Sequence, residues 1–339
     1  MGIASHIVRR LLLIFPMLIG VTLAIFVVSH LVPADPLAVI LDQKAMSNPE
    51  QRQAAIDKWG LDSSLPEQYL RYVLNLARGD LGVSFRSKRP VAQDLREYLP
   101  ATIELAFSAL AFALLAGLPL GILAALYSGR WVDHLARVIS LLGASMPPFW
   151  SGLMALYVFY FRLQVLPGPG RISSRMVMPE TTTGLLVVDS LLARNGAALS
   201  SALSHLVLPA VILGWFSLAL IARITRASLL EVLGMDYIRT AHAKGLYARQ
   251  VIVVHALRNA LIPTVTILGL EVSWLLAGSI MTETIFAWPG IGKYAVDAAR
   301  TLDIPALMGT ALVIAVVFML SSLLVDILYA VIDPRIVEV

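Results

Sequence analysis

Cysteine is absent from this chain of 339 residues, and charged side chains account for only 14% of it. The lack of cysteine excludes disulfide bonds, thiol catalysis and cysteine-ligated metal, and it does not identify the cellular compartment. Soluble domains are about 25% charged and about 45–50% apolar, whereas 58% of this chain is hydrophobic. The composition therefore indicates a polytopic membrane protein whose apolar segments form one bundle.

Nucleotide-binding and metal-binding motifs are also missing. The segment Gly290–Lys293 superficially resembles a phosphate loop, but a Walker A motif needs Gly, four residues, and then Gly-Lys-Ser/Thr. Ala287 stands at the first glycine and Tyr294 at the hydroxyl residue. The histidines have no metal-ligand spacing at His205, His242 and His255. We therefore expect no catalytic residues, no ATPase site and no metal site in this chain.

Six apolar segments are candidates for crossing a bilayer, which takes about 20 predominantly apolar residues. The expected spans are Leu11–Leu31, Ala101–Tyr127, Val138–Val165, His205–Ala222, Leu261–Met281 and Ala306–Ile332. The first is too long for the apolar part of a signal peptide, so we interpret it as an uncleaved span. Pro147 and Pro148 should bend the third span. The expected fold class is an all-α polytopic membrane protein with six spans.

Lys and Arg residues suggest the orientation of these spans, because cytoplasmic loops carry an excess of them. An even number of spans places both termini on one side. The side assigned to the cytoplasm holds eleven: Arg9, Arg10, Arg130, Arg137, Arg223, Arg226, Arg239, Lys244, Arg249, Arg258 and Arg335. The short outer segments hold six: Arg162, Arg171, Arg175, Arg194, Lys293 and Arg300. This bias explains the net charge of +4 without nucleic-acid binding.

Residues 33–100 form a long polar segment with nine basic and nine acidic side chains. Long domains cross the membrane regardless of charge, so this segment is exempt from the charge rule. Helical periodicity is visible in Pro49–Trp59 and Pro66–Ala77. Because structureless loops of this length are uncommon, we predict a small helical extracytoplasmic insertion. Leu185–Leu192, farther along the chain, is too short to span and is predicted to be an interfacial helix.

Arg226–Pro263 lies between two apolar segments yet carries five basic residues. Gly234 is expected to end one helix in a left-handed conformation. Asp236 is expected to cap a new helix over Tyr237–Lys244, a length of about 12 Å, which Gly245 ends. A second amphipathic run follows and leads back to the membrane. A short helix held broadside at a membrane surface has a shape suited to docking.

Two motifs in this stretch, RTAHAKG at Arg239–Gly245 and HALRNALIP at His255–Pro263, resemble the cytoplasmic coupling loop of permease subunits of binding-protein-dependent ABC importers. The Arg239–Ala241 tripeptide replaces the general Glu-Ala-Ala, and the gap from Gly245 to Pro263 is longer than the general pattern. Both departures are usual in the dipeptide/oligopeptide/nickel branch. Similar pieces occur at Leu31–Pro36, Gly79–Ser84, Glu283–Gly292 and Leu323–Arg335.

The resemblance covers nearly the whole chain and implies a type I ABC importer permease bundle. Its expected parts are residues 1–32, the insertion 33–100, and a five-span core 101–339 with a coupling loop at 226–262. It implies a subunit of a dipeptide or short-oligopeptide importer in the bacterial inner membrane, with both termini cytoplasmic. Nickel, glutathione and opine permeases share this architecture. A self-sufficient secondary carrier is the competing class, but the internal repeats it would need are not visible.

The implied partners are a second, homologous permease that completes the pore, an extracytoplasmic binding protein, and two cytoplasmic ATPases that bind ATP and Mg²⁺. The resemblance implies that the ATPases contact Tyr237, Ile238, Arg239, Thr240, Ala241, His242, Ala243, Lys244 and Gly245. Small residues there permit close approach, and Arg239 and Lys244 could pair with carboxylates of the partner. The alternative is an amphipathic helix bound to anionic lipid.

Glu271 lies at the middle of the fifth span, ten residues from each end. A charged side chain there costs roughly 2.5–3.5 kcal/mol on insertion scales, so it should face the bundle interior or water. One interpretation places it with Trp274 on the translocation path, where it attracts a cationic group such as a peptide ammonium or Ni²⁺. The alternative is a protonated carboxyl hydrogen-bonded to a neighbouring helix. The resemblance does not imply an acidic residue at this position.

Three further features of the spans carry predictions. Phe286 and Trp288, just outside the fifth span, are typical of a membrane-interface belt, and the alternative is an outer gate or a seat for a binding protein. Gly117 and Gly121 have the GxxxG spacing that lets helix backbones approach closely. Glu104, at the outer end of the second span, is expected to meet headgroups or water.

Overall fold

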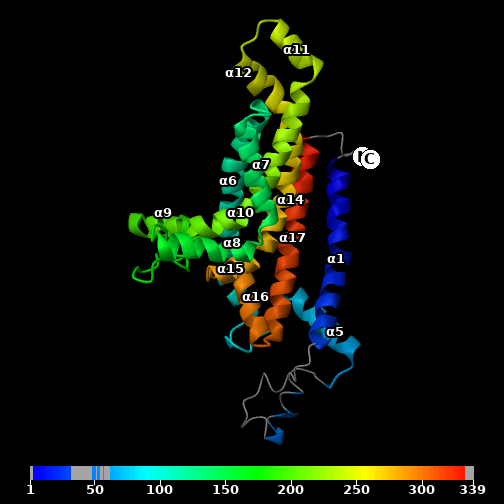
Figure 1. The fold of residues 1–339 in the computed structure, drawn as a ribbon. Coiled ribbons are helices and arrows are strands. Elements are labelled where there is room, and N and C mark those ends of the chain that lie inside the picture. Colours follow the sequence, from blue (N-terminus) through cyan, green and yellow to red (C-terminus); the bar gives the residue numbers. More distant parts are fainter. Residues whose placement is uncertain (1–2, 32–47, 51, 54–55, 57–61, 333–339) are drawn as a thin grey trace.

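A bundle of long helices dominates the computed structural model of this chain (Figure 1). The structure describes residues 3–31, 48–50, 52–53, 56 and 62–332. Much of the predicted insertion up to residue 61 and the end of the C-terminal motif, residues 333–335, lie outside the described residues. In the described part, the only extended pairing is an isolated bridge between Val83 and Pro90, so the expected all-α class is confirmed.

Four helices are long and apolar enough to cross a membrane alone. They are α1 (Ile3–Leu31), α6 (Val91–Leu126), α10 (Gly196–Leu233) and α17 (Ile304–Ile332). Two bent pairs bring the count to as many as six spans. The first joins α7 (Trp131–Ser145) to α8 (Pro148–Ala155) and the π-helix η1 (Leu156–Arg162). The second joins α12 (Ala248–Gln250), η2 (Val251–Ala256) and α13 (Leu257–Ala260) to α14 (Ile262–Gly278).

The shorter helices lie at the ends and side of this bundle (Figure 1). They are α5 (Leu65–Ala77), α9 (Leu186–Leu192), α11 (Asp236–Ala243), α15 (Ile280–Ile285) and α16 (Ile291–Arg300). The start of α1 and the end of α17 lie at the same end as α11, whereas α5 and α16 lie at the opposite end. Four spanning helices, or six spans if each bent pair counts as one, are compatible with this arrangement.

The helix α6 packs tightly along α10, and the predicted close approach at the GxxxG spacing is confirmed. A Cβ atom added at Gly117 would lie 3.0 Å from the carbonyl oxygen of Leu218, and one at Gly121 would lie 2.6 Å from that of Ala222. Gly214 faces the carbonyl oxygen of Ala109 in the same way. Backbones this close leave no room for side chains, so the glycines set the separation of the two helices.

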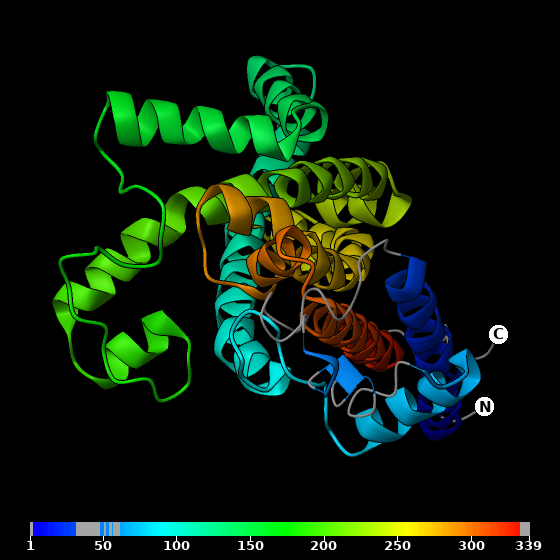
Figure 2. The same cartoon turned by 90° about the horizontal axis from the view of Figure 1, so that it is seen from below.

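The third predicted span is not one helix. Its first half begins at Trp131, and the chain then turns by 108° into α8 and η1. Met146 and Pro147 both have extended backbones, with ψ of 128° and 130°, because a residue that precedes proline avoids the helical region. As Figures 1 and 2 show, α8 and η1 leave the bundle sideways, together with α9 and the beginning of α10. We call these segments the lateral arm.

The fourth predicted span, His205–Ala222, is too short, because α10 covers 38 residues, about 57 Å at 1.5 Å per residue. Its N-terminus is capped by Asn195, whose side chain accepts from the N–H of Ala198 at 3.0 Å. Hydropathy ends the span at the first polar residues, whereas the helix continues because those residues find partners in the fold. The helix therefore takes part in both the lateral arm and the α11 end of the bundle.

The predicted helix at Leu185–Leu192 is confirmed as α9. Burial alone would raise the pKa of Asp189, but hydrogen bonds to its carboxylate lower it. The hydroxyl and N–H of Thr183 and the N–H of Gly184 donate to its carboxylate at 2.7 to 2.9 Å. The predicted helical period at Pro66–Ala77 is likewise confirmed as α5, where burial raises the pKa of Tyr72 to about 12.

Candidate functional site

The short helix α11 stands at one end of the bundle (Figure 1). It ends as predicted, because Gly245 adopts a left-handed φ of +78° that suits glycine at the residue after a helix cap. Two details of the prediction are wrong. Gly234 ends α10 with φ of −80°, in the right-handed region. The N-cap is Met235, so Asp236 is the first helical residue and makes no capping bond.

One face of α11 is held by the chain itself. Ile238 is 2% exposed and Ala241 is 8% exposed. They pack in an apolar cluster formed by the ends of α6 and α10 and by the returning segment: Ala125, Leu229, Val232, Val251, Ala256 and Ala260. Three of these partners are alanines, which allow the helix to sit close to the bundle. A displacement of α11 would therefore act directly on the end of α10, because the two helices are in contact.

The other face of α11 is open. It carries the remaining predicted contact residues, all exposed: Tyr237, Arg239, Thr240, His242, Ala243, Lys244 and Gly245. Arg239 pairs with Asp236 at 3.4 Å, but both side chains are exposed, so the pair contributes little. Tyr237 is fixed by the amide of Asn259, which donates to its hydroxyl at 2.8 Å. Of the nine predicted residues, seven form this free face and two anchor the helix.

Glu271 and Trp274 lie one turn apart on α14 but differ in their surroundings. Glu271 is 5% exposed and accepts a hydrogen bond from the hydroxyl of Ser217 on α10. Trp274 is exposed and lines a groove of about 350 Å³ between the α7–α8 bend, α10 and α14. Of the two residues, only Trp274 lines this groove, and a place for both on the translocation path stays a prediction. The contact of Glu271 is the one expected for a carboxyl hydrogen-bonded to a neighbouring helix.

Phe286 and Trp288 are 2% and 1% exposed, so the interpretation of these rings as a membrane-interface belt is wrong. The indole N–H of Trp288 donates to the carbonyl oxygen of Ala101 at 2.8 Å. The ring thus satisfies a backbone group of α6 and joins the loop after α15 to the bundle. An indole N–H needs such a partner when it is buried, and Ala101 supplied one that the sequence could not reveal.

Glu283 organises the same loop. It is fully buried and accepts hydrogen bonds from the hydroxyls of Thr102 and Ser279 at 2.7 and 2.8 Å and from the N–H of Lys293 at 3.0 Å. A Cβ atom at Gly290 would collide with its carboxyl group. The Gly290–Lys293 segment that resembles a phosphate loop is therefore wrapped around a protein carboxyl group.

Glu104 does not meet headgroups or water, contrary to expectation. It is 8% exposed and forms a salt bridge with Arg171 at 2.5 Å, while the N–H of Val187 donates to it at 2.7 Å. The guanidinium of Arg171 also lies 5.4 Å from the ring centroid of Trp288. This pair fastens the lateral arm to α6. Because Arg171 lies 67 residues from Glu104 in the sequence, no local pattern indicates that the two residues pair.

The ion pair between Asp133 and Arg226, near α11, was not predicted from the sequence. Asp133, in the first turn of α7, is fully buried and accepts from the guanidinium of Arg226 on α10 at 2.7 and 2.9 Å. The N–H of Gly129 donates to the same carboxylate at 3.0 Å. The available signal is Asp133 itself, a lone acidic residue beside an otherwise basic turn.

The bundle of long apolar helices defines a multi-pass membrane protein. A family described as the binding-protein-dependent transport system inner membrane component matches residues 117–338, and the N-terminal component of the same systems matches residues 3–106. This chain belongs to the binding-protein-dependent transport system inner membrane component family.

Full-length relatives agree with that assignment. The chain is 46% identical to a probable D,D-dipeptide transport system permease protein of Escherichia coli K12, over 94% of this chain and 93% of that protein. It is 43% identical to the dipeptide transport system permease protein of the same strain, over 98% of each. It is 44% identical to a di/tripeptide transport system permease protein of Pseudomonas aeruginosa, over 98% of each.

Proposed function

We propose that this chain is the transmembrane permease subunit of an ATP-driven importer of dipeptides and short oligopeptides, in which it forms half of the translocation pore. The names of the full-length relatives support the substrate class. Permeases for nickel, glutathione or opines are the alternative within the same architecture. A second, homologous permease would supply the other half of the pore, and an extracytoplasmic binding protein would deliver the peptide.

The free face of α11 is the proposed docking surface for a cytoplasmic ATPase. One observation carries this proposal: the apolar residues Ile238 and Ala241 point into the chain, so the outward face of α11 is polar and basic. An amphipathic helix that binds lipid needs its apolar face turned toward the membrane. A protein partner with acidic side chains suits the outward face better. ATP and Mg²⁺ would bind to that partner.

The absence of cysteine allows a direct test. A Thr240→Cys variant places one thiol on the free face, and Thr301→Cys places one at the far end of the bundle as a control. Both would be purified with and without the ATPases that co-purify with the chain, and their labelling by a maleimide compared. ATPase binding should protect the first thiol and leave the second reactive. Equal reactivity of the first thiol in both samples contradicts docking at α11.

Transport is tested separately with the complete complex in liposomes. Uptake of a labelled dipeptide should require ATP, the binding protein and the ATPases. Uptake by this chain alone, driven by an ion gradient, would instead identify a secondary carrier. ATP-driven uptake of Ni²⁺ without uptake of peptide would contradict the proposed substrate and leave the docking proposal intact.

A further inference from the structure

The Asp133–Arg226 pair lies where α11 joins the bundle. Leu229 and Val232, one and two turns beyond Arg226 on α10, pack against Ile238 and Ala241 of α11. A displacement of α11 therefore reaches α10 as well as the returning segment, residues 251–260. The two bonds from Arg226 to Asp133 then connect α10 to the first turn of α7. A bidentate bond of this kind fixes orientation as well as distance.

A second contact holds α7 to α10 about 15 Å farther along, at 1.5 Å per residue. A Cβ atom at Gly143 would collide with the ring of Trp215, so the indole presses against the α7 backbone. The indole N–H also donates to the carbonyl oxygen of Ile139 at 3.3 Å. From Asp133 to Gly143, α7 is thus attached to α10 at both ends, by polar bonds at one and by close packing at the other.

Just beyond this attached section, α7 ends before a pair of prolines and α10 contains one. The chain turns by 108° at the α7–α8 bend, and Pro209 lies inside α10, where it lacks the N–H that would bond to the preceding turn. Ile212, one turn from Pro209, lines the same groove as Pro147 and Pro148. The attached sections of α7 and α10 therefore begin at a common level, where each helix is weakest against bending.

We propose that Asp133 and Arg226 fasten α7 to α10 so that both move as one body when α11 is displaced, with the bending taken up at Pro147–Pro148 and at Pro209. This inference rests on the proposed function, in which an ATPase displaces α11. The moving body ends at the groove that holds Trp274, so its motion changes the width of that groove. Asp133 and Arg226 are positioning residues that pass motion from the docking surface to a candidate part of the transport path.

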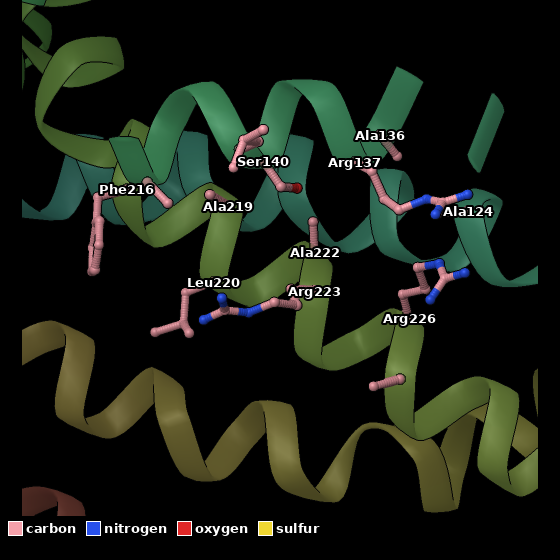
Figure 3. Close-up of a pocket in the computed structure, with 13 residues that line it drawn as sticks. Ala124, Ala136, Arg137, Ser140, Phe216, Ala219, Leu220, Ala222, Arg223 and Arg226 are labelled. Atoms are coloured by element: carbon pink, nitrogen blue, oxygen red, sulfur yellow. The ribbon is translucent and has the colours of Figure 1, made fainter. Parts of the chain in front are cut away.

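Arg137 offers a matched control. It also contacts Asp133, at 3.3 Å, but it lies on α7 itself and projects with Arg226 toward the same end of a second groove between α7 and α10 (Figure 3). Its side chain is 54% exposed. Because Arg137 and Asp133 both lie on α7, their contact adds no link between the helices. Loss of Arg226 should break the attachment, and loss of Arg137 should leave it intact.

The first test measures peptide transported per ATP hydrolysed in the reconstituted complex. Arg226→Gln should lower this ratio about three- to tenfold, the effect expected when one contact in a packed network is lost, while ATP hydrolysis continues. Arg137→Gln should leave the ratio at the wild-type value. An unchanged ratio in Arg226→Gln overturns the inference. Absence of ATP-driven uptake in the wild-type complex would instead contradict the proposed function.

The second test holds even if Arg226→Gln fails to assemble, because it uses the wild-type contacts. Spin labels on Leu135→Cys and Glu231→Cys report the distance between α7 and α10. Labels on Leu135→Cys and Leu153→Cys report the distance across the bend. Between nucleotide-free and ATP-trapped complexes, the first distance should stay constant and the second should change. A first distance that changes as much as the second shows that the helices do not move together and overturns the inference.

Discussion

At the scale of residues, buried carboxyl groups join segments that lie far apart in the sequence. Glu104 holds the lateral arm through Arg171, Asp133 joins α7 to α10, and Glu283 ties the loop after α15 to α6. Each of these groups is paired or hydrogen-bonded, as burial of a polar group requires. A chain with few charged residues thus uses several of them at junctions between helices.

Glu271 allows a prediction at this scale. Because an amide oxygen can also accept the hydrogen bond from Ser217, Glu271→Gln should transport peptide at the wild-type rate, with the same dependence on pH. Uptake measured across a range of pH values checks this. Ser217→Ala serves as the comparison and should lower stability by about 1–3 kcal/mol, because it leaves a buried acceptor without its donor. Loss of uptake in Glu271→Gln, with normal assembly, would place the carboxylate on the transport path.

Sequence reasoning identified some of these residues and none of their partners. The cost of a mid-span carboxylate singled out Glu271, and aromatic content singled out Trp288. Their environments depend on Ser217 and Ala101, which are 54 and 187 residues away in the sequence. Helical periodicity reaches only a few residues, so a single sequence carries no pattern that links such distant positions.

At the scale of elements, close packing of α6 on α10 gives the bundle its centre. The apolar clusters along this pair contain many alanines, among them Ala101, Ala109 and Ala210. Apolar burial drives little association within lipid, so tight backbone contact is what small residues provide there. The GxxxG spacing in α6 predicted this contact correctly but could not name α10 as the partner.

Gly121→Ala tests the packing of these two helices. The added methyl group would lie 2.6 Å from the carbonyl oxygen of Ala222, so the helices must separate. We expect a loss of about 1–3 kcal/mol in stability, as for other overpacked interiors, measured by thermal unfolding in detergent. Gly20→Ala on α1 is the control, because its Cβ would meet nothing within 4 Å. Equal unfolding temperatures for the two variants would show that the contact is not tight.

Hydropathy predicted the existence of every spanning helix and failed at particular ends. It stopped α10 at Ala222 because Arg223 and Arg226 follow, although the helix continues to Leu233. It treated Val138–Val165 as one span because it measures apolar content and not direction. The prolines indicated a bend there, but its size depends on how α8 packs against the rest of the fold.

At the scale of the whole molecule, α11, the start of α1 and the end of α17 share one end of the bundle. The charge bias predicts that this end faces the cytoplasm. Right-side-out and inside-out vesicles carrying single cysteines can test this orientation with an impermeant maleimide. Thr240→Cys should react only in inside-out vesicles, and Thr301→Cys only in right-side-out vesicles. Reaction of both thiols from the same side would contradict the six-span topology.

The lateral arm carries aromatic side chains that the rest of this chain does not cover. Phe149, Trp150 and Phe161 are among these exposed residues, and in the proposed transporter the second permease would pack against them. Substitutions at these positions would leave the solitary subunit nearly as stable as before and would weaken only the finished transporter. In that proposed assembly, chains made in excess of the second permease would keep these side chains uncovered, which membrane quality control can recognise.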